Sequence, residues 1–431
     1  MIINFSVQNF GSIKDKQTLS FEADKSTHLE STYVVNVGKE RILKLALIYG
    51  ANASGKTTIL KALDFLIDLV LRPKSIKTDE LDFDPFLFDP NTPTQNSLMS
   101  IEFIENKVKY LYEVTFFKKA IVTEELYFYK PNKASIYKRT TNLADQFTKI
   151  QFGNKTHKNK TFEKTLEANT LWNNTVLGGY LKTNIDFKEL KEVANWFTYY
   201  LKSIIYTNTN IEKSVRFKIE MSEISKTDII GILKKADFNI SNIIIEEKEK
   251  IDSLLDFLVK SGKMTKDIAQ KLKENQMSNG DMNIEFEHTV NGIKYTLPMA
   301  LESQGTRRYF SFAGLLTVLI KNSTVISIDE LESSLHPDLY LHFLLSFLTN
   351  AKNSQLIATT HNREILDNKD IFRNDAIWIT DKKADCATEL YSLADFDSNT
   401  IRNTTNVLNA YKSGKLSGTP NLGDVFIDLN P

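Results

Sequence analysis

Eight residues, Gly50–Thr57 with the sequence GANASGKT, constrain the fold of this chain more than any other feature. They match the pattern G-x-x-x-x-G-K-[ST] at every fixed position. Its glycines let the backbone wrap around phosphates, Lys56 supplies a positive charge, and the Thr57 hydroxyl can bind magnesium.

Such a loop needs a strand before it and a helix after it. The apolar run Ile42–Tyr49 has strand length, and Thr57–Leu71 is apolar on nearly every face, as in a buried helix. The sequence therefore predicts a loop that binds a nucleoside triphosphate; a chance match is the alternative.

A second chemical feature is the strand-like segment Thr324–Glu330, TVISIDE, which ends in two carboxylates. Beside a phosphate loop, the first carboxylate, Asp329, would hold magnesium, usually through water. The second, Glu330, would orient or deprotonate the attacking water. An ordinary strand that ends in acids is the alternative interpretation. More than 250 residues separate Lys56 from Asp329, so we expect a large domain inserted between the two halves of the site.

Composition limits the class of protein. The 431 residues are 42% hydrophobic and carry 54 basic and 54 acidic side chains, so no net field draws the chain to nucleic acid. A single cysteine, Cys386, excludes a disulfide framework. The N-terminal MIINFSVQNF lacks the basic start and apolar core of a signal peptide, and no apolar run reaches membrane length. We expect a cytoplasmic protein without a membrane partner.

One segment departs from this charge balance. Between Lys130 and Lys164, nine lysines and arginines face only Asp145 and Glu163, which leaves a net charge of roughly +7. The segment is a candidate for contact with a DNA duplex. A solvated basic loop is the alternative.

The remaining pattern predicts three regions. The chain begins as strand, turn and strand, and alternating aromatic segments over 98–130 predict an antiparallel meander. Residues 185–276 are mainly helical in pattern, with a possible hairpin of Ile251–Val259 and Met264–Glu274 around Gly262. Residues 286–298 return to strand-like composition, and the final part alternates strands and helices. The predicted domains are 1–125, 126–295 and 296–431.

Two further motifs flank the acidic strand: SQGT at Ser303–Thr306 and QLIATTH at Gln355–His361. In this order they resemble the ABC-type ATPases, specifically the branch with Rad50, SMC, RecF and the overcoming-lysogenization-defect proteins. NFGSIKD, DELESSLHP, TTHNREILD and AYKSGKLSGTPNLGD are also similar to stand-alone AAA-family ATPases of bacterial phage-defence and abortive-infection systems. The resemblance implies an α/β fold: an ABC-type P-loop ATPase head, with a mixed sheet, an antiparallel β subdomain and a mainly helical inserted lobe.

The resemblance also implies a head-to-tail dimer with ATP and Mg²⁺ between two copies. The signature turn of one copy, with Ser303 and Gly305 before a helix starting near Thr306, would cap the γ-phosphate held by the other. Gln304 stands where transporter subunits have a glycine, and an ordinary helix cap explains the same residues. His361 would sense the γ-phosphate and Glu330 would act on water. The implied nucleotide contacts are Gly50, Asn52, Ala53, Ser54, Gly55, Lys56, Thr57, Thr58, Ser303 and Gly305; the metal ligands are Thr57 and Asp329.

Two assignments stay open at this point. His336 falls in the segment that crosses the dimer interface in the family, but it equally suits a helix start before Pro337. In the family, a magnesium-binding glutamine lies in the loop that joins the two lobes. Gln95 is a candidate for this glutamine, or it lies in a plain loop.

The expected function is a Mg-dependent ATPase that acts as a nucleotide-driven dimer switch. It would be a homodimer or higher homo-oligomer that regulates a separate effector protein in antiphage defence. Only some sixty residues follow TTHNREILD, too few for the Toprim nuclease of several relatives, so the effector would be another chain. The alternatives are a RecF- or Rad50-like ATPase acting on DNA, and a scaffold in which ATP is a structural ligand.

Overall fold

The computed structural model describes residues 1–154, 160–245, 284–396 and 407–420, with a few single positions between 259 and 270. The chain forms two compact units. Unit 1 comprises Met1–Thr207, Asn322–Glu332 and Leu348–Pro431, and unit 2 comprises Asn208–Lys321 and Ser333–Phe347. The hairpin expected around Gly262, and Lys155 and Lys158 of the basic segment, lie outside the described residues. The bounds of the three predicted domains remain predictions.

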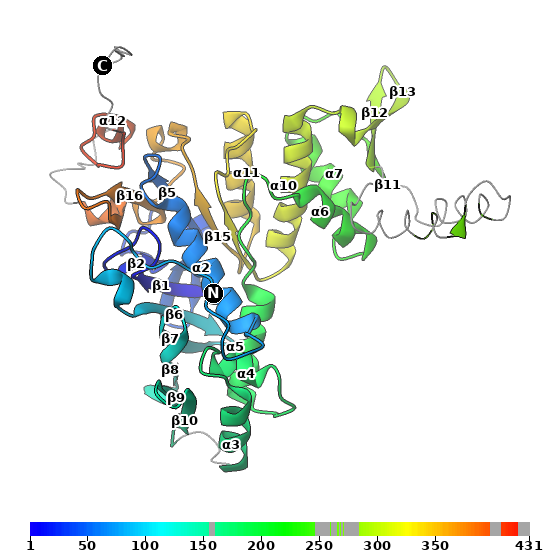
Figure 1. Cartoon of the computed structure of the whole chain (residues 1–431). Coiled ribbons are helices and arrows are strands. Elements are labelled where there is room, and N and C mark those ends of the chain that lie inside the picture. Colours follow the sequence, from blue (N-terminus) through cyan, green and yellow to red (C-terminus); the bar gives the residue numbers. More distant parts are fainter. Residues whose placement is uncertain are drawn as a thin grey trace, which may run out of the picture. The chain divides into compact units, whose positions relative to one another are not determined.

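The centre of unit 1 is a five-stranded sheet in the order β14-β15-β5-β16-β17 (Figure 1). The first four strands are parallel and β17 is antiparallel to β16. Every residue of β5, β14 and β15 is buried, which fits their largely apolar sequences. The strands are β5 (Leu45–Gly50), β14 (Val325–Ile328), β15 (Gln355–Thr359), β16 (Ile377–Lys382) and β17 (Thr388–Ser392).

The helix predicted after the phosphate loop is confirmed as α2, Lys56–Leu71. The strand predicted before it is present but divided: β4 covers Glu40–Leu43 and β5 starts at Leu45. Lys44 separates the two, because its buried ammonium donates hydrogen bonds to the carbonyls of Leu348 and, at 2.9 Å, Ala351. Burial lowers the pKa of Lys44 to about 8.

A second, seven-stranded sheet of unit 1 is antiparallel, in the order β10-β9-β8-β7-β6-β1-β2. It confirms the meander predicted over 98–130 and extends it. Gln355 on β15 links the two sheets, because its side chain accepts a hydrogen bond from the Ile2 amide at 2.6 Å and donates one to the Ile2 carbonyl at 2.9 Å. The strands are β1 (Ile2–Gln8), β2 (Gln17–Ser20), β6 (Ser97–Glu105), β7 (Val108–Phe117), β8 (Ala120–Tyr129), β9 (Lys133–Asn142) and β10 (Phe147–Phe152).

The expectation of a basic loop over 130–164 is wrong for most of this segment, which forms β9, β10 and the start of helix α3 (Lys160–Asn169). Arg139 is fully buried and donates to the Ile121 carbonyl at 2.8 Å and the Trp172 carbonyl at 3.0 Å. Lys138 pairs with Glu125 on the adjacent strand at 3.1 Å. Some of the positive charges are therefore buried or paired within the sheet. A count of charges in the sequence does not reveal this.

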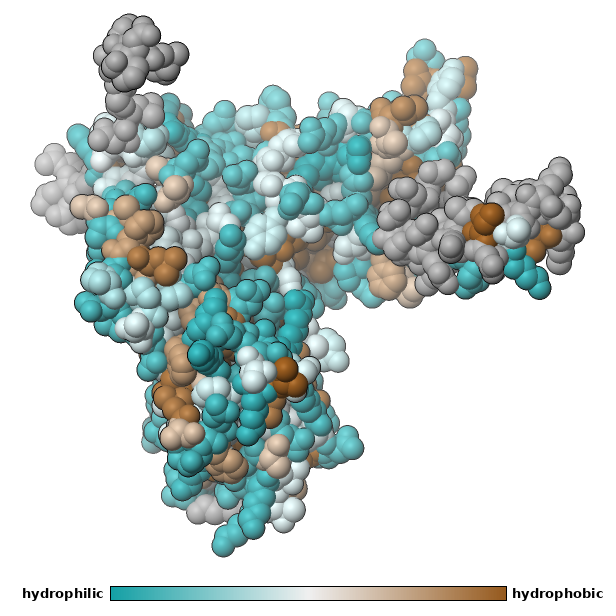
Figure 2. All heavy atoms as spheres, viewed as in Figure 1, coloured by the Kyte–Doolittle hydropathy of each residue, from teal (hydrophilic) through white to brown (hydrophobic). Residues whose placement is uncertain are grey.

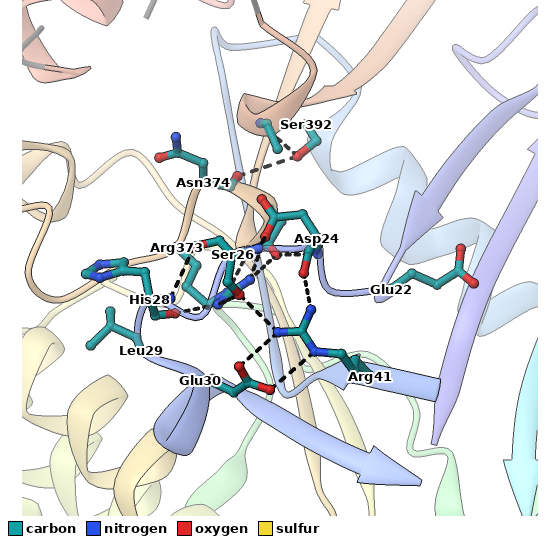
Figure 3. Close-up of polar contacts among 12 residues, drawn as sticks. Glu22, Asp24, Ser26, His28, Leu29, Glu30, Arg41, Arg373, Asn374 and Ser392 are labelled. Atoms are coloured by element: carbon teal, nitrogen blue, oxygen red, sulfur yellow. Dashed lines mark hydrogen bonds and ion pairs between the residues drawn. The ribbon is translucent and has the colours of Figure 1, made fainter. Parts of the chain in front are cut away.

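Two arginines hold the loop over residues 22–30 of unit 1 (Figure 3). Arg373, almost fully buried, binds Asp375 through two nitrogens at 2.9 and 2.6 Å and Asp24 at 2.8 Å. Arg41 binds the Glu30 carboxylate at 3.2 and 3.1 Å. Because Arg373 follows β15, the network connects the segment after that strand to the N-terminal loop.

The remaining helices and strands of unit 1 are short. A buried single-turn helix, α4, is capped by Thr175, whose hydroxyl accepts the Gly178 amide at 3.0 Å. These elements are α1 (Glu30–Tyr33), β3 (Val34–Val37), α4 (Val176–Tyr180), α5 (Lys188–Asn195), a π-helical turn at Trp196–Tyr200 and α12 (Val407–Lys412), with 3₁₀ turns at Thr92–Thr94, Glu364–Asp367, Asn374–Ala376 and Leu393–Asp395.

Unit 2 combines helices with a small antiparallel sheet, β11-β12-β13. Helix α10 packs against α6 and α7 so closely that a Cβ on Gly314 would lie 2.4 Å from Val215. Phe286 of β12 stacks edge-on with Phe310 of α10 at 5.3 Å. The elements are α6 (Ile211–Glu220), α7 (Lys226–Lys235), β11 (Asn242–Ile245), β12 (Ile284–Val290), β13 (Ile293–Pro298), a 3₁₀ turn at Met299–Leu301, α10 (Gln304–Lys321) and α11 (Pro337–Asn350), which continues into unit 1.

The face drawn in Figure 2 is largely hydrophilic, with apolar side chains in small groups. Among the described residues, no helix combines the length and the apolar character that crossing a bilayer requires.

Candidate nucleotide site

Three neighbouring parallel strands of unit 1 end at one edge of the sheet. β5 leads into the GANASGKT loop, β14 into Asp329 and Glu330, and β15 into His361. The carboxyl ends of parallel strands are the usual ligand-binding edge of an α/β sheet. Chain segments that are far apart in sequence therefore bring the predicted lysine, carboxylates and histidine to one place.

The loop needs glycine at positions 50 and 55 because other residues lie too close for a side chain. Gly55 has φ +100°, and a Cβ there would lie 2.0 Å from Thr388 Oγ1. A Cβ on Gly50 would lie 2.3 Å from Thr380 Oγ1. Ala53 also has a positive φ of 60°, a conformation rare for residues with a side chain. The loop is thus shaped by two threonines of β16 and β17, which sequence reasoning missed.

Lys56 is buried and already bound by its own loop. Its ammonium donates to the carbonyls of Gly50 at 3.0 Å and Ala51 at 2.9 Å. Burial lowers the pKa of Lys56, while the negative charges of Asp329 and Glu330 oppose this effect. The lysine is therefore held at the mouth of the loop, where the phosphates of a nucleotide would meet it.

Asp329 connects two segments of the site through hydrogen bonds. Its carboxylate accepts hydrogen bonds from the Thr57 hydroxyl at 3.0 and 3.1 Å, and from the Thr359 hydroxyl at 2.6 Å. A threonine hydroxyl and a carboxylate in direct contact are the hard oxygen donors that Mg²⁺ takes from protein beside nucleotide phosphates. The two predicted metal ligands thus lie together and fit the ion.

Glu330 follows with a strained backbone. Its φ is +49°, and its amide donates to the Thr359 hydroxyl at 2.8 Å. Its side chain is exposed. Thr359 thus holds both acidic residues, and only the TTH motif before the histidine hinted at it. Strained backbone of this kind concentrates at functional sites.

His361 lies just beyond the end of β15. Burial lowers the pKa of its imidazole, as does the charge of Lys56, while Glu332 and Glu330 oppose the shift. Its main-chain amide donates to Glu332 Oε1 at 2.5 Å. Three charged groups of the candidate site therefore influence this histidine electrostatically.

The other predicted nucleotide contacts differ in availability. Asn52 and Ala53 are exposed at the loop tip. The Ser54 hydroxyl is buried against Thr380 Oγ1 at 2.6 Å, and Thr58 Oγ1 is bound by Ser12 at 2.9 Å. The side chains of Ser54 and Thr58 therefore stabilise the loop. Their main-chain amides also donate within it, to the carbonyls of Ala51 at 3.3 Å and Gly55 at 3.0 Å.

The predicted signature turn belongs to unit 2. Helix α10 begins at Gln304, two residues before the expected start, and the Ser303 hydroxyl accepts the Thr306 amide at 3.1 Å. Ser303 and Gln304 are exposed. A Cβ on Gly305 would meet nothing closer than the Ser334 carbonyl, at 3.6 Å. Packing within unit 2 therefore does not explain the glycine.

The two open assignments are not decided by these contacts. His336 is exposed, and its ring accepts the Asp338 amide at 3.3 Å, as a residue at the start of α11 can do. Gln95 is exposed and ends a 3₁₀ turn, where its carbonyl accepts a hydrogen bond from Asn9 at 3.1 Å.

Together, the loop, the sheet order and the Thr57–Asp329 contact define a P-loop nucleotide-binding protein. Residues 45–367 match the family described as "AAA domain, putative AbiEii toxin, Type IV TA system". The chain belongs to this family, whose members are AAA-type ATPases, and the predicted resemblance to abortive-infection ATPases is confirmed. The predicted α/β class is confirmed by the mixed and antiparallel sheets.

Solved structures similar to this chain include an SMC head domain from Thermotoga maritima, with 13% identity and a TM-score of 0.38 over 91% of this chain and 98% of that chain. An SMC head bound to the C-terminal winged-helix domain of ScpA has 13% identity and a TM-score of 0.46 over 91% and 97%. An SMC head with an extended coiled coil, bound to the C-terminal domain of ScpA derived from Pyrococcus furiosus, has 12% identity and a TM-score of 0.38 over 96% and 98%. A comparison with curated proteins found no similar sequence.

Proposed function

We propose that this chain binds and hydrolyses ATP with Mg²⁺, and that ATP closes two copies of it into a dimer that controls a separate effector in antiphage defence. The observation that carries the proposal is the cluster at the sheet edge, where Thr57 meets Asp329 directly and Lys56, Glu330 and His361 surround them.

Each residue has a distinct task in this mechanism. The amides of the loop and the Lys56 ammonium bind the β- and γ-phosphates. Thr57 and Asp329 hold the metal, which when bound neutralises charge on the phosphates. Glu330 accepts a proton from the attacking water, and its exposed side chain is free to reach that water. His361 donates a hydrogen bond to the γ-phosphate.

The openness of the signature turn supports its contact with a second copy. Ser303 is exposed, a Cβ on Gly305 would meet nothing closer than 3.6 Å, and both residues lie at the N-terminus of α10. Such a surface suits a triphosphate bound by another copy. Closure by ATP and opening by hydrolysis would then signal to the effector.

The family description, with its toxin and abortive-infection terms, supports defence over DNA repair. The alternative of a DNA-acting ATPase depended on the basic segment 130–164. Its charges are in part buried or paired, as Arg139 and Lys138 are, so no observation favours this alternative.

A Glu330→Gln variant tests the mechanism. We expect ATP hydrolysis to fall by about 10²–10³-fold, because the general base is lost. ATP binding should persist, so that the variant elutes as a larger species on size exclusion when ATP and Mg²⁺ are added. A wild-type rate of turnover in this variant would exclude Glu330 as the base.

A further inference from the structure

Glu332 forms a contact that the proposed mechanism does not use. Its Oε1 accepts the main-chain amide of His361 at 2.5 Å. Its Oε2 is buried and accepts no hydrogen bond from the described part of the chain. A buried carboxylate oxygen without a partner is unfavourable, so fold stability alone is a poor reason for this residue.

The His361 amide is the first one past the end of the sheet. The amide of Thr360 still donates to the Ile48 carbonyl of β5 at 3.1 Å, while that of His361 turns to Glu332. Further along, the same segment is bound by the N-terminal loop: the Lys369 carbonyl accepts from His28 at 2.8 Å and the Ile371 carbonyl from Tyr33 at 2.7 Å, before Arg373 binds Asp24 (Figure 3). Glu332 therefore fixes the point at which the chain leaves β15.

Glu332 also belongs to the loop that carries the acidic pair. It lies three residues after Asp329, and the Leu331 amide between them donates to the Thr359 carbonyl at 3.1 Å. The loop 329–332 and the end of β15 are thus joined by three hydrogen bonds at Thr359 and by the bond from His361 to Glu332. A shift of Glu330 would consequently move His361.

We propose that Glu332 is a positioning residue for His361: it binds the histidine's main chain and keeps it in register with Glu330 at the γ-phosphate. The role rests on the proposed ATPase function. It requires an acceptor oxygen at this position and not a negative charge, because the contact is a hydrogen bond from a neutral amide.

Amide hydrogen exchange on the full chain tests the contact without reference to catalysis. Glu332→Ala should raise the exchange rate of the 359–363 segment by about tenfold or more, because the His361 amide loses its acceptor. Glu332→Gln, which retains an acceptor oxygen, should stay within about threefold of wild type. Glu364→Ala, which removes an exposed carboxylate directly after this segment, is the matched control. Unchanged exchange in Glu332→Ala would overturn the proposal.

Steady-state kinetics test the consequence. We expect Glu332→Ala to lower kcat by about 10–100-fold with KM for ATP within a few-fold, since the phosphates are held by the P-loop. Glu332→Gln should restore most of kcat. If Glu332→Gln were as slow as Glu332→Ala, the charge and not the position would matter, and the proposal would fail. Absence of turnover in wild type would refute the ATPase function, while the exchange result would still decide the contact. Thermal unfolding of each variant identifies any that do not fold.

Discussion

The phosphate loop of unit 1 and the signature turn of unit 2 differ in how many contacts they make with the rest of the chain. Around the loop, Thr380, Thr388 and Asp329 bind its side chains or restrict its glycines. Around the turn, Ser303 only caps its own helix, and Gly305 has no close neighbour. The first region is shaped by this chain, whereas the second is unobstructed. Under the proposed function, the second region is open to a nucleotide bound by another copy.

The sharpest test of this comparison mixes two variants. Lys56→Ala removes phosphate binding, and Gly305→Asp places a negative charge at the turn; each alone should be inactive. Gly305→Asp has room and suits a helix N-terminus, so the fold should persist. If the two regions act between copies, random pairing of equal amounts leaves one intact site in half of the dimers. ATP turnover should then recover to about a quarter of wild type. No recovery would indicate that both regions act within one chain.

A second prediction concerns the shaped region. Gly55→Ala should weaken ATP binding by about 100-fold, because the methyl group would collide with Thr388 and because φ +100° is unfavourable for alanine. Fluorescent-nucleotide titration measures the change. Gly38→Ala is the control, since Gly38 has φ +65° but nothing within 4 Å. It should lose stability without losing affinity; equal affinity loss in both would point to a global effect.

A third prediction concerns the open region. Ser303→Ala should lower ATP turnover by about tenfold and stability by about 1 kcal/mol, the usual effect of losing a helix cap. Ser225→Ala matches it, because Ser225 caps α7 through the Thr227 amide at 3.1 Å. This control should show the same stability loss with full turnover. If both variants hydrolyse ATP normally, Ser303 is only a cap.

The last prediction separates two buried lysines of unit 1. Lys44 and Lys56 each donate to two carbonyls, but acidic residues surround only Lys56. Burial lowers the pKa of Lys44 to about 8, below its unfolded value of 10.5. As the pH rises, the folded state therefore loses this proton before the unfolded state does. The burial of the charged lysine lowers the free energy of unfolding below pH 8, and this cost disappears as the pH rises toward 10.5.

The free energy of unfolding of wild type relative to Lys44→Met should consequently rise by about 2 kcal/mol between pH 8 and 10. Urea unfolding at several pH values measures this difference. Parallel pH curves for the two proteins would show that Lys44 stays protonated in the fold.

The strongest sequence signals were local. GANASGKT, its strand and its helix were predictable because a phosphate loop needs neighbouring residues in a set order. The meander over 98–130 was predictable because alternation has the period of a strand. The same reasoning failed for 130–164, since the basic side chains there hide two strands: β9, which pairs with β8, and β10, which pairs with β9.

By itself, the sequence determined which chemical groups the chain offers: a lysine, a threonine, two carboxylates and a histidine, each at the end of an apolar run. Only the tertiary structure decided which other residues bind these groups or hold them in place. Thr359 binds both acidic residues, Thr388 enforces Gly55, and Glu332 holds His361. Threonine and glutamate carry no motif of their own, and strand order in a parallel sheet is set by packing between distant segments. These partners therefore become visible only when the strands lie side by side.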